Sequence, residues 1–294
     1  MIRIGLAGAG PWATLFHAPL LASSEEFEFV AVWARRPEAA QELAAQHEVR
    51  AVRSYEELLD CCDAISFAVP PDVQPGLAIA AAHAGRHLLL DKPLGRSVDE
   101  ALALQEAACD VATLLLLRNR FTNAVQDFLD RCLATQVRAV VAGFVAGGVL
   151  PGSFFATPWR VAEPHALLDL GPHALDLLEA AAGSITRVAA AASGGVLHLT
   201  TRHADGASAS VVLSSVTPDS PGGLRCVAVT DTGRIEMGDP DAEPVQEAIM
   251  AEFAAAIRGE RTARVDVNRG VLLQRLIAAA QESLVQDRPV ECPV

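Results

Sequence analysis

The sequence predicts an α/β protein in two parts: a doubly wound parallel sheet in the N-terminal part and an α+β C-terminal part with a mainly antiparallel sheet. Three observations predict this. Short apolar strands alternate with helical stretches up to about residue 117. Those strands are almost continuously apolar, as in a parallel sheet covered on both faces. After about residue 120, strand-like runs instead follow one another closely, separated by turn signals such as "ADGA" and "DTG".

The first part, predicted as a domain over residues 1–118, contains five strands and five helices. The expected strands are 2–7, 28–33, 64–69, 86–90 and 112–117. The expected helices between them are 12–23, 37–46, 54–59, 72–84 and 97–110.

The second part, predicted as a domain over residues 119–294, begins with a helix and a long strand. A Gly/Pro-rich loop, another helix, a group of strands and two closing helices follow, expected at 147–164, 165–182, 185–237, 244–258 and 268–286. The opening helix and strand are expected at 122–134 and 137–146. Alternating apolar residues in "VLHLT" and "ASVVLSS" predict a sheet face that pairs with another subunit, in a homo-dimer or homo-tetramer.

Composition restricts the class of function. The net charge of −13 argues against binding to nucleic acid or to an anionic membrane surface. No apolar run reaches the roughly 18 residues that a membrane span needs, and "MIRIGLAGAG" does not resemble a signal peptide. The six cysteines show no metal-binding or disulfide spacing, so we expect free thiols and a cytoplasmic protein.

The stretch "GAGPWA" at residues 8–13 predicts a dinucleotide site. It is a G-x-G-x-x-A motif that follows a predicted strand and opens a predicted helix. Gly8 would form the tight turn, Gly10 would let a pyrophosphate approach the backbone, and Ala13 would let helix and sheet pack closely. Pro11 and Trp12 lie within the same candidate site.

The end of the second strand, "VAVWARRP", predicts which cofactor binds. An acidic residue that would bind the ribose hydroxyls of NAD is expected there, but the position holds Ala34, followed by Arg35 and Arg36. Two arginines in place of an acid favour NADP, whose 2′-phosphate they would bind, with NAD as the alternative. In the simpler interpretation, both are solvated residues at the start of a helix.

Two further strand ends meet the same edge of the predicted sheet. "FAVPPD" places Val69 and Pro70 beside the expected cofactor crevice, and "HLLLDKPLG" places Asp91 and Lys92 there. A lysine after three leucines is a solvated turn residue or a residue with a chemical role.

The chain resembles the glucose–fructose oxidoreductase/inositol dehydrogenase (Gfo/Idh/MocA) family, whose N-terminal domain is a Rossmann fold. The family's E-K-P motif appears as Asp91-Lys92-Pro93, and its N-x-R segment as "RNRF". "PWR" at 158–160 and "LLDLGPHALDLLEAAAG" at 167–183 resemble its W-R and D-x-G-x-H-x-x-D signatures. The C-terminal "FAAAIRGERTARVDV" and the helix after it resemble its closing helix pair. Gln74 stands where many members have His, and the chain is shorter than many; both differences bear on the substrate.

The signature residues Asp169, His173 and Asp176 would share one helical face, at i, i+4 and i+7. Gly171 and Pro172 predict that the helix starts within the motif, with Asp169 near its N-terminus. Taken alone, Asp169 is equally well a helix cap and His173 a satisfied interface histidine. His165 with Asp169 and His173 has metal-ligand spacing, but the prolines and the resemblance favour no metal.

The resemblance implies hydride transfer between the nicotinamide and a secondary alcohol or ketone, most plausibly of a sugar or cyclitol. Lys92 would stabilise charge on the substrate oxygen, His173 would be the leading general acid or base, and Asp169 would orient both. Which of Lys92 and His173 moves the proton stays open. Arg120 and Arg160 are candidate cofactor and substrate contacts, or surface ion-pair residues. The alternatives are a non-catalytic sensor that binds the cofactor, and transient oxidation during glycoside cleavage.

Overall fold

A computed structural model describes residues 1–161, 165–220, 222–242 and 244–292. The chain forms two compact units, and each unit combines two stretches of the sequence. The first unit is built from Met1–Leu116 and Val245–Val271, and the second from Leu117–Pro244 and Leu272–Val294. The domain boundary expected after residue 118 stays a prediction.

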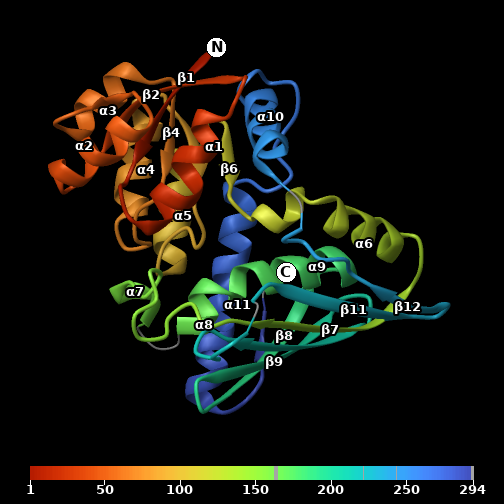
Figure 1. Cartoon of the computed structure of the whole chain (residues 1–294). Coiled ribbons are helices and arrows are strands. Elements are labelled where there is room, and N and C mark those ends of the chain that lie inside the picture. Colours follow the sequence, from red (N-terminus) through yellow and green to blue (C-terminus); the bar gives the residue numbers. More distant parts are fainter. Residues whose placement is uncertain (162–164, 221, 243, 293–294) are drawn as a thin grey trace. The chain divides into compact units, whose positions relative to one another are not determined.

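The first unit is built on a six-stranded parallel sheet, which confirms the doubly wound Rossmann fold (Figure 1). Its order is β3 (Arg50–Ala51), β2 (Phe27–Trp33), β1 (Ile2–Ala7), β4 (Ala64–Phe67), β5 (His87–Leu90) and β6 (Thr113–Leu115). Every residue of β4 and β6 is buried, as expected for strands covered on both faces. The strand order reverses between β1 and β4, and ligands of such sheets bind at the carboxyl ends beside this point.

Helices connect these strands, and their starts are encoded locally. They are η1 (Ala13–His17), α1 (Ala18–Ala22), α2 (Pro37–Gln46), α3 (Tyr55–Cys61), α4 (Gln74–His83) and α5 (Val98–Ala107). Ser54 caps α3 by accepting from the Glu57 N–H, and Ser97 with Glu100 forms a capping box at α5. Helix α10 (Gln246–Ile257) packs on α1 and β6 although it lies far away in the sequence.

The second unit contains a seven-stranded sheet that is mixed but mainly antiparallel. Its order is β12 (Gly233–Glu236), β11 (Leu224–Thr230), β7 (Val137–Val145), β10 (Ser208–Ser214), β9 (Val196–His203), β8 (Ile185–Ser193) and β13 (Val290–Glu291). Among the described strand pairs of this second sheet, β7 and β10 are parallel and all the others are antiparallel. Helix α9 (Gly171–Ala182) packs against β7, β10 and β11, as Figure 1 shows.

The helix expected at 165–182 is in fact two helices, α8 (His165–Asp169) and α9, separated at Leu170. Pro172 has no N–H with which to continue the helical hydrogen bonds, and its ring restricts the residue before it. Asp169 therefore ends α8 and does not cap α9, whose N-terminus has no side-chain cap.

The remaining elements of the chain are η2 (Arg118–Phe121), α6 (Asn123–Leu133), α7 (Pro158–Val161) and α11 (Val267–Gln286). Helix α7 lies inside the segment expected as a loop at 147–164, whose last three residues, 162–164, lie outside the described residues. In the part of the chain that the structure describes, no helix combines the length and apolarity needed to cross a bilayer.

Candidate functional site

Gly8 lies in a turn directly after β1 that only glycine fits. Its φ is +127°, a value that side chains rarely adopt. A Cβ atom at this position would lie 2.2 Å from the carbonyl oxygen of Ala68, and the Gly8 N–H donates to the Trp33 carbonyl at 2.8 Å. The turn therefore places the chain between the ends of β2 and β4, at the carboxyl edge of the sheet.

The backbone that follows Gly8 is open to the approach of a ligand. A Cβ atom at Gly10 would meet no heavy atom within 4 Å, and helical structure begins at residue 11 and continues to residue 22. Ala13 is fully buried, so a small side chain lets this helix pack on the sheet. Free N–H groups at a helix start bind phosphates, and the open approach at Gly10 fits the pyrophosphate of a dinucleotide.

Arg35 and Arg36 follow β2 and are both exposed. Arg36 stands at the N-cap position of α2 without a side-chain cap hydrogen bond. Neither guanidinium forms an ion pair with any residue that the structure describes. Both therefore have their hydrogen-bond donors available at the strand end where a ribose is expected.

Val69 and Pro70 follow β4, which ends at Phe67, two residues earlier than expected. Both residues are half-buried, and the Pro70 carbonyl accepts from the N–H groups of Val73 and Gln74. This turn starts α4 and brings the Gln74 side chain under the end of β5.

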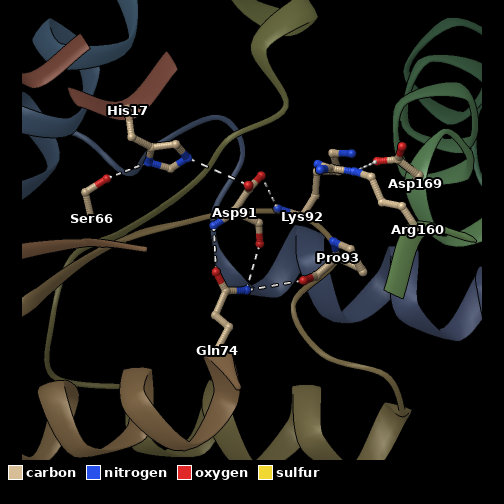
Figure 2. Close-up of polar contacts among 8 residues, drawn as sticks. All are labelled: His17, Ser66, Gln74, Asp91, Lys92, Pro93, Arg160 and Asp169. Carbon is tan, nitrogen blue, oxygen red and sulfur yellow. Dashed lines mark hydrogen bonds and ion pairs between the residues drawn. The ribbon is translucent and has the colours of Figure 1, made fainter. Parts of the chain in front are cut away.

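Lys92 lies in a turn at the end of β5, residues 91–94, and this turn is held by Gln74 (Figure 2). The Gln74 Nε2 donates to the carbonyls of Asp91, Pro93 and Leu94 at 2.8, 3.2 and 3.1 Å. Its Oε1 accepts from the Asp91 N–H at 2.9 Å. Lys92 itself is half-buried, and the Lys92–Pro93 peptide bond is cis.

A buried polar chain reaches the same turn from η1 and β4. His17 and Ser66 are both 0% exposed, with 2.8 Å between His17 Nδ1 and Ser66 Oγ. His17 Nε2 lies 3.7 Å from Asp91 Oδ2, and Asp91 Oδ1 accepts from the Lys92 N–H at 2.8 Å. Figure 2 shows the imidazole between the serine and the carboxylate. The sequence prediction missed His17 and Ser66, because their contacts join residues 49 or more positions apart.

Lys92 is the only lysine among the 23 lysines and arginines of the chain, and all the rest are arginines. At most surface positions the two cations serve equally well, but an ammonium group differs from a guanidinium because it can release its proton. A lysine at this one position favours the chemical role expected for it, which stays a prediction. The sequence analysis identified Lys92 from its motif, and the composition of the chain was a second signal that pointed to the same residue.

The other candidate catalytic residues belong to the second unit. Asp169 Oδ1 lies 3.4 Å from Arg160 Nε, with both side chains more than four-fifths buried (Figure 2). The Arg160 guanidinium also stacks over Trp159, 4.6 Å from the ring centroid, and lies 5.9 Å from that of Phe155. The aromatic rings and the carboxylate together fix this cation.

His173 and Asp176 both lie on α9 but have different surroundings. His173 is half-buried, with its ring 6.0 Å from that of Phe144. Asp176 is 2% exposed, and both its oxygens lie 3.0 Å from Arg120 Nη1. Arg120 therefore neutralises a buried carboxylate of its own unit, so this ion pair is not the surface pair considered as the alternative, and a contact of Arg120 with the cofactor stays a prediction.

The spacing of His165, Asp169 and His173 suggested a metal set, but the His165 side chain lies outside the described residues. Among the residues that are described, no group of three histidine, cysteine, aspartate or glutamate side chains is arranged to hold a metal ion. The six thiols are free.

Comparison with known proteins gives the same interpretation as the sheet-edge geometry. Residues 2–116 match the oxidoreductase family with the NAD-binding Rossmann fold that is named after Gfo, Idh and MocA. The N-terminal part of the chain, residues 2–116, is thus similar to the NAD-binding Rossmann domain of the Gfo/Idh/MocA family.

Two curated proteins to which the chain is similar are named as a sugar reductase and an inositol dehydrogenase. A dTDP-3,4-didehydro-2,6-dideoxy-alpha-D-glucose 3-reductase of Streptomyces violaceoruber is 32% identical over 64% of this chain and 56% of its own length. The scyllo-inositol 2-dehydrogenase (NADP(+)) IolU of Bacillus subtilis is 32% identical over 37% of this chain and 34% of its own. The matches thus span about half or less of these relatives.

A solved structure extends the likeness in fold to both units. The WlbA dehydrogenase from Bordetella pertussis, in complex with NADH and UDP-GlcNAcA, superposes with a TM-score of 0.84. The match covers 100% of this chain and 98% of that one at 20% identity, so it shows the fold alone.

Proposed function

We propose that the protein is an NAD(P)-dependent oxidoreductase that acts on a secondary alcohol or ketone of a sugar, cyclitol or related polyhydroxylated molecule. The observation that carries this proposal is the position of the only lysine, in the Asp91-Lys92-Pro93 turn at the carboxyl edge of a Rossmann sheet. The curated relatives, which are named for sugar and inositol substrates, support the substrate class.

The proposed cofactor site uses residues at the carboxyl ends of β1, β2, β4 and β5. Gly8, Gly10 and Ala13, with Pro11 and Trp12, would bind the pyrophosphate at the helix start. Val69, Pro70, Asp91 and Lys92 would lie along the nicotinamide half, and Arg120 stays a candidate contact. When bound, the nicotinamide supplies the hydride chemistry, and the protein supplies orientation and proton handling.

In the proposed mechanism, the Lys92 ammonium donates a hydrogen bond to the substrate oxygen and stabilises negative charge that develops on it. Either His173 or Lys92 accepts the hydroxyl proton during oxidation and returns it during reduction; His173 is the leading candidate, since an imidazole titrates close to neutral pH. Asp169 orients the reacting groups, and Arg160, which contacts Asp169, binds a polar group of the substrate.

The preference for NADP is part of the proposal and rests on Arg35 and Arg36. These exposed guanidinium groups follow β2 without an ion-pair partner among the described residues, and Ala34 leaves no acid to repel a 2′-phosphate. The relatives include an enzyme named for NADP and a structure with NADH, so both cofactors occur among similar proteins.

The proposal is tested by fluorescence titration of NADPH and NADH into the wild type and the Arg35→Ala/Arg36→Ala variant. We expect NADPH to bind at least about 10-fold more tightly than NADH, and the variant to lose that difference. Equal binding of the two cofactors would contradict the NADP preference. Binding without turnover of inositols or nucleotide-linked sugars would favour a sensor, and binding of neither cofactor would overturn the oxidoreductase function.

A homo-oligomer formed through the open face of the second sheet is also proposed, in a cytoplasmic protein. The alternating apolar residues on which this expectation rested, Leu197, Leu199, Val211 and Leu213, are buried within the unit and offer no face to a partner. The proposal rests instead on Val141 and Val229, which lie on neighbouring strands of this sheet and are 57% and 44% exposed. A monomeric mass in light scattering at micromolar concentration would contradict it.

A further inference from the structure

The Gln74 side chain is buried more deeply than a substrate contact would be. It is 1% exposed, although it is the first residue of α4. Among the described residues, all four hydrogen bonds of the side chain go to backbone groups of the turn 91–94, and none goes to another side chain. Gln74 therefore acts on the turn that carries Lys92 and does not face a substrate.

The hydrogen bonds of Gln74 replace those that the turn cannot obtain from the sheet. Strand β5 ends at Leu90, so the carbonyls of Asp91, Pro93 and Leu94 lie beyond the last strand pairing. Buried carbonyls without partners are costly, by about 1–3 kcal/mol each. The two Nε2 hydrogens of one carboxamide serve these three carbonyls, at least one hydrogen being shared, and its Oε1 accepts from the Asp91 N–H. A single imidazole, with two ring nitrogens, cannot make this set of contacts.

The opposite side of the turn is fixed through the Asp91 carboxylate. One oxygen accepts from the Lys92 N–H, and the other faces the fully buried His17, whose Nδ1 contacts Ser66. The backbone at Lys92 is thus held between α4 on one side and η1 with β4 on the other. These contacts leave the Lys92 backbone little freedom, so the side chain starts from a fixed point.

We propose that Gln74 is a positioning residue that sets the place and direction of the Lys92 ammonium by holding the turn 91–94. An amide has no charge to gain or lose, so this hold is the same at every pH at which the protein is folded. The effect on turnover rests on the proposed function, in which Lys92 is catalytic. The effect on the geometry of Lys92 does not.

The presence of a single lysine makes the proposal directly measurable. Protein grown with 13C-labelled lysine gives one ε-carbon signal, that of Lys92. Its chemical shift, line width and titration are compared in the wild type, Gln74→Glu and Gln74→Ala. Gln74→Glu keeps the volume of the side chain and an acceptor for the Asp91 N–H but lacks the Nε2 donors to the three carbonyls.

A matched control is Gln274→Ala. Gln274 lies in α11, in the second unit, and is also 1% exposed. This variant removes an equally buried glutamine that makes none of the four hydrogen bonds by which Gln74 holds the turn. It reports what loss of a buried amide does to stability alone, measured as the thermal unfolding midpoint.

We expect both Gln74 variants to shift and broaden the Lys92 signal and to lower kcat about 100-fold, with the KM for NADP changed less than about 3-fold. Gln274→Ala should leave the signal and kcat unchanged. A folded Gln74 variant with a wild-type Lys92 signal would overturn the proposal. A shifted signal in a protein whose wild type turns over no substrate supports positioning by Gln74 while it removes the proposed function.

Discussion

The turn 91–94 and the segment made of residues 155–161 and 165–169 both carry candidate site residues, but these residues are held by different kinds of contact. The turn is held through its backbone by buried groups, chiefly Gln74. In the segment, Arg160 is held through its side chain, by aromatic rings and by Asp169. Contacts to backbone groups persist when a side chain of the turn is replaced, whereas the contacts of Arg160 change with its side chain. We therefore predict that substitutions in the turn change kcat, and that substitutions at Arg160 change the KM for the substrate.

The largest effect is expected from Lys92→Met, which removes the ammonium but keeps the length of the side chain. Because the ammonium would stabilise charge in the transition state, we expect kcat to fall by about 1,000-fold, with NADPH affinity within about 3-fold of the wild type. Steady-state kinetics and fluorescence titration measure the two quantities. Retention of more than a tenth of wild-type kcat would show that the chemistry does not depend on this turn.

A smaller effect is expected from Arg160→Lys in the segment. The ammonium keeps the charge but loses the planar stacking over Trp159 and the geometry of the Asp169 contact. We expect KM for the substrate to rise about 10-fold, which corresponds to about 1.4 kcal/mol, while kcat changes less than about 3-fold.

Arg187→Lys is the matched control for this measurement. Arg187 also pairs with a carboxylate of the second unit, Glu291, but both side chains are largely exposed. Exposed pairs contribute little, so its kinetics should equal those of the wild type. A fall in kcat without a change in KM for Arg160→Lys would break the division between turn and segment.

The smallest effect on activity, namely none, is expected from His203→Gln. His203 is buried like His17, but its ring nitrogens contact the Gly183 carbonyl and Thr201 in the second unit. Burial lowers the pKa of His203, although the Gly183 carbonyl and the charges of Glu179 and Asp205 oppose this. A loss of activity in this variant, like the loss expected for Lys92→Met, would show that any disturbed buried residue impairs function.

The same variant should change how stability depends on pH. A histidine with a lowered folded-state pKa contributes stability that is present above its unfolded value of about 6.5 and is lost as pH falls through the folded pKa. Thermal unfolding between pH 7 and 5 should therefore show a smaller decrease in midpoint for His203→Gln than for the wild type. The pKa of His87 is also lowered by burial, so part of the decrease should persist. An unchanged pH dependence would contradict this role.

The sequence predicted the Rossmann strands well, because a strand buried on both faces must be apolar along its whole length. The strand expected at 2–7 was found at those residues, and α2 at its expected 37–46. The break in the helix at Leu170 was predicted only in part. Gly171 and Pro172 indicated that a helix starts there, but they did not indicate that Asp169 ends a separate helix.

The contacts around Lys92 could not be predicted from sequence, because they join distant parts of the chain. Gln74 and Asp91 are 17 positions apart, and His17 and Asp91 lie on different elements whose distance depends on the whole sheet. A buried glutamine has no local pattern that distinguishes it from a substrate contact. The parallel sheet brings the ends of β4 and β5 together and so places Gln74 under the turn.

The single lysine also determines how the protein responds to amine-directed reagents. Lys92 carries the only side-chain amine of the sequence, so an acylating agent, a crosslinker or an activated resin has a single lysine to attack. Attachment at Lys92 would block the candidate site. Immobilisation of this protein through a lysine would therefore disable it, however the coupling is carried out.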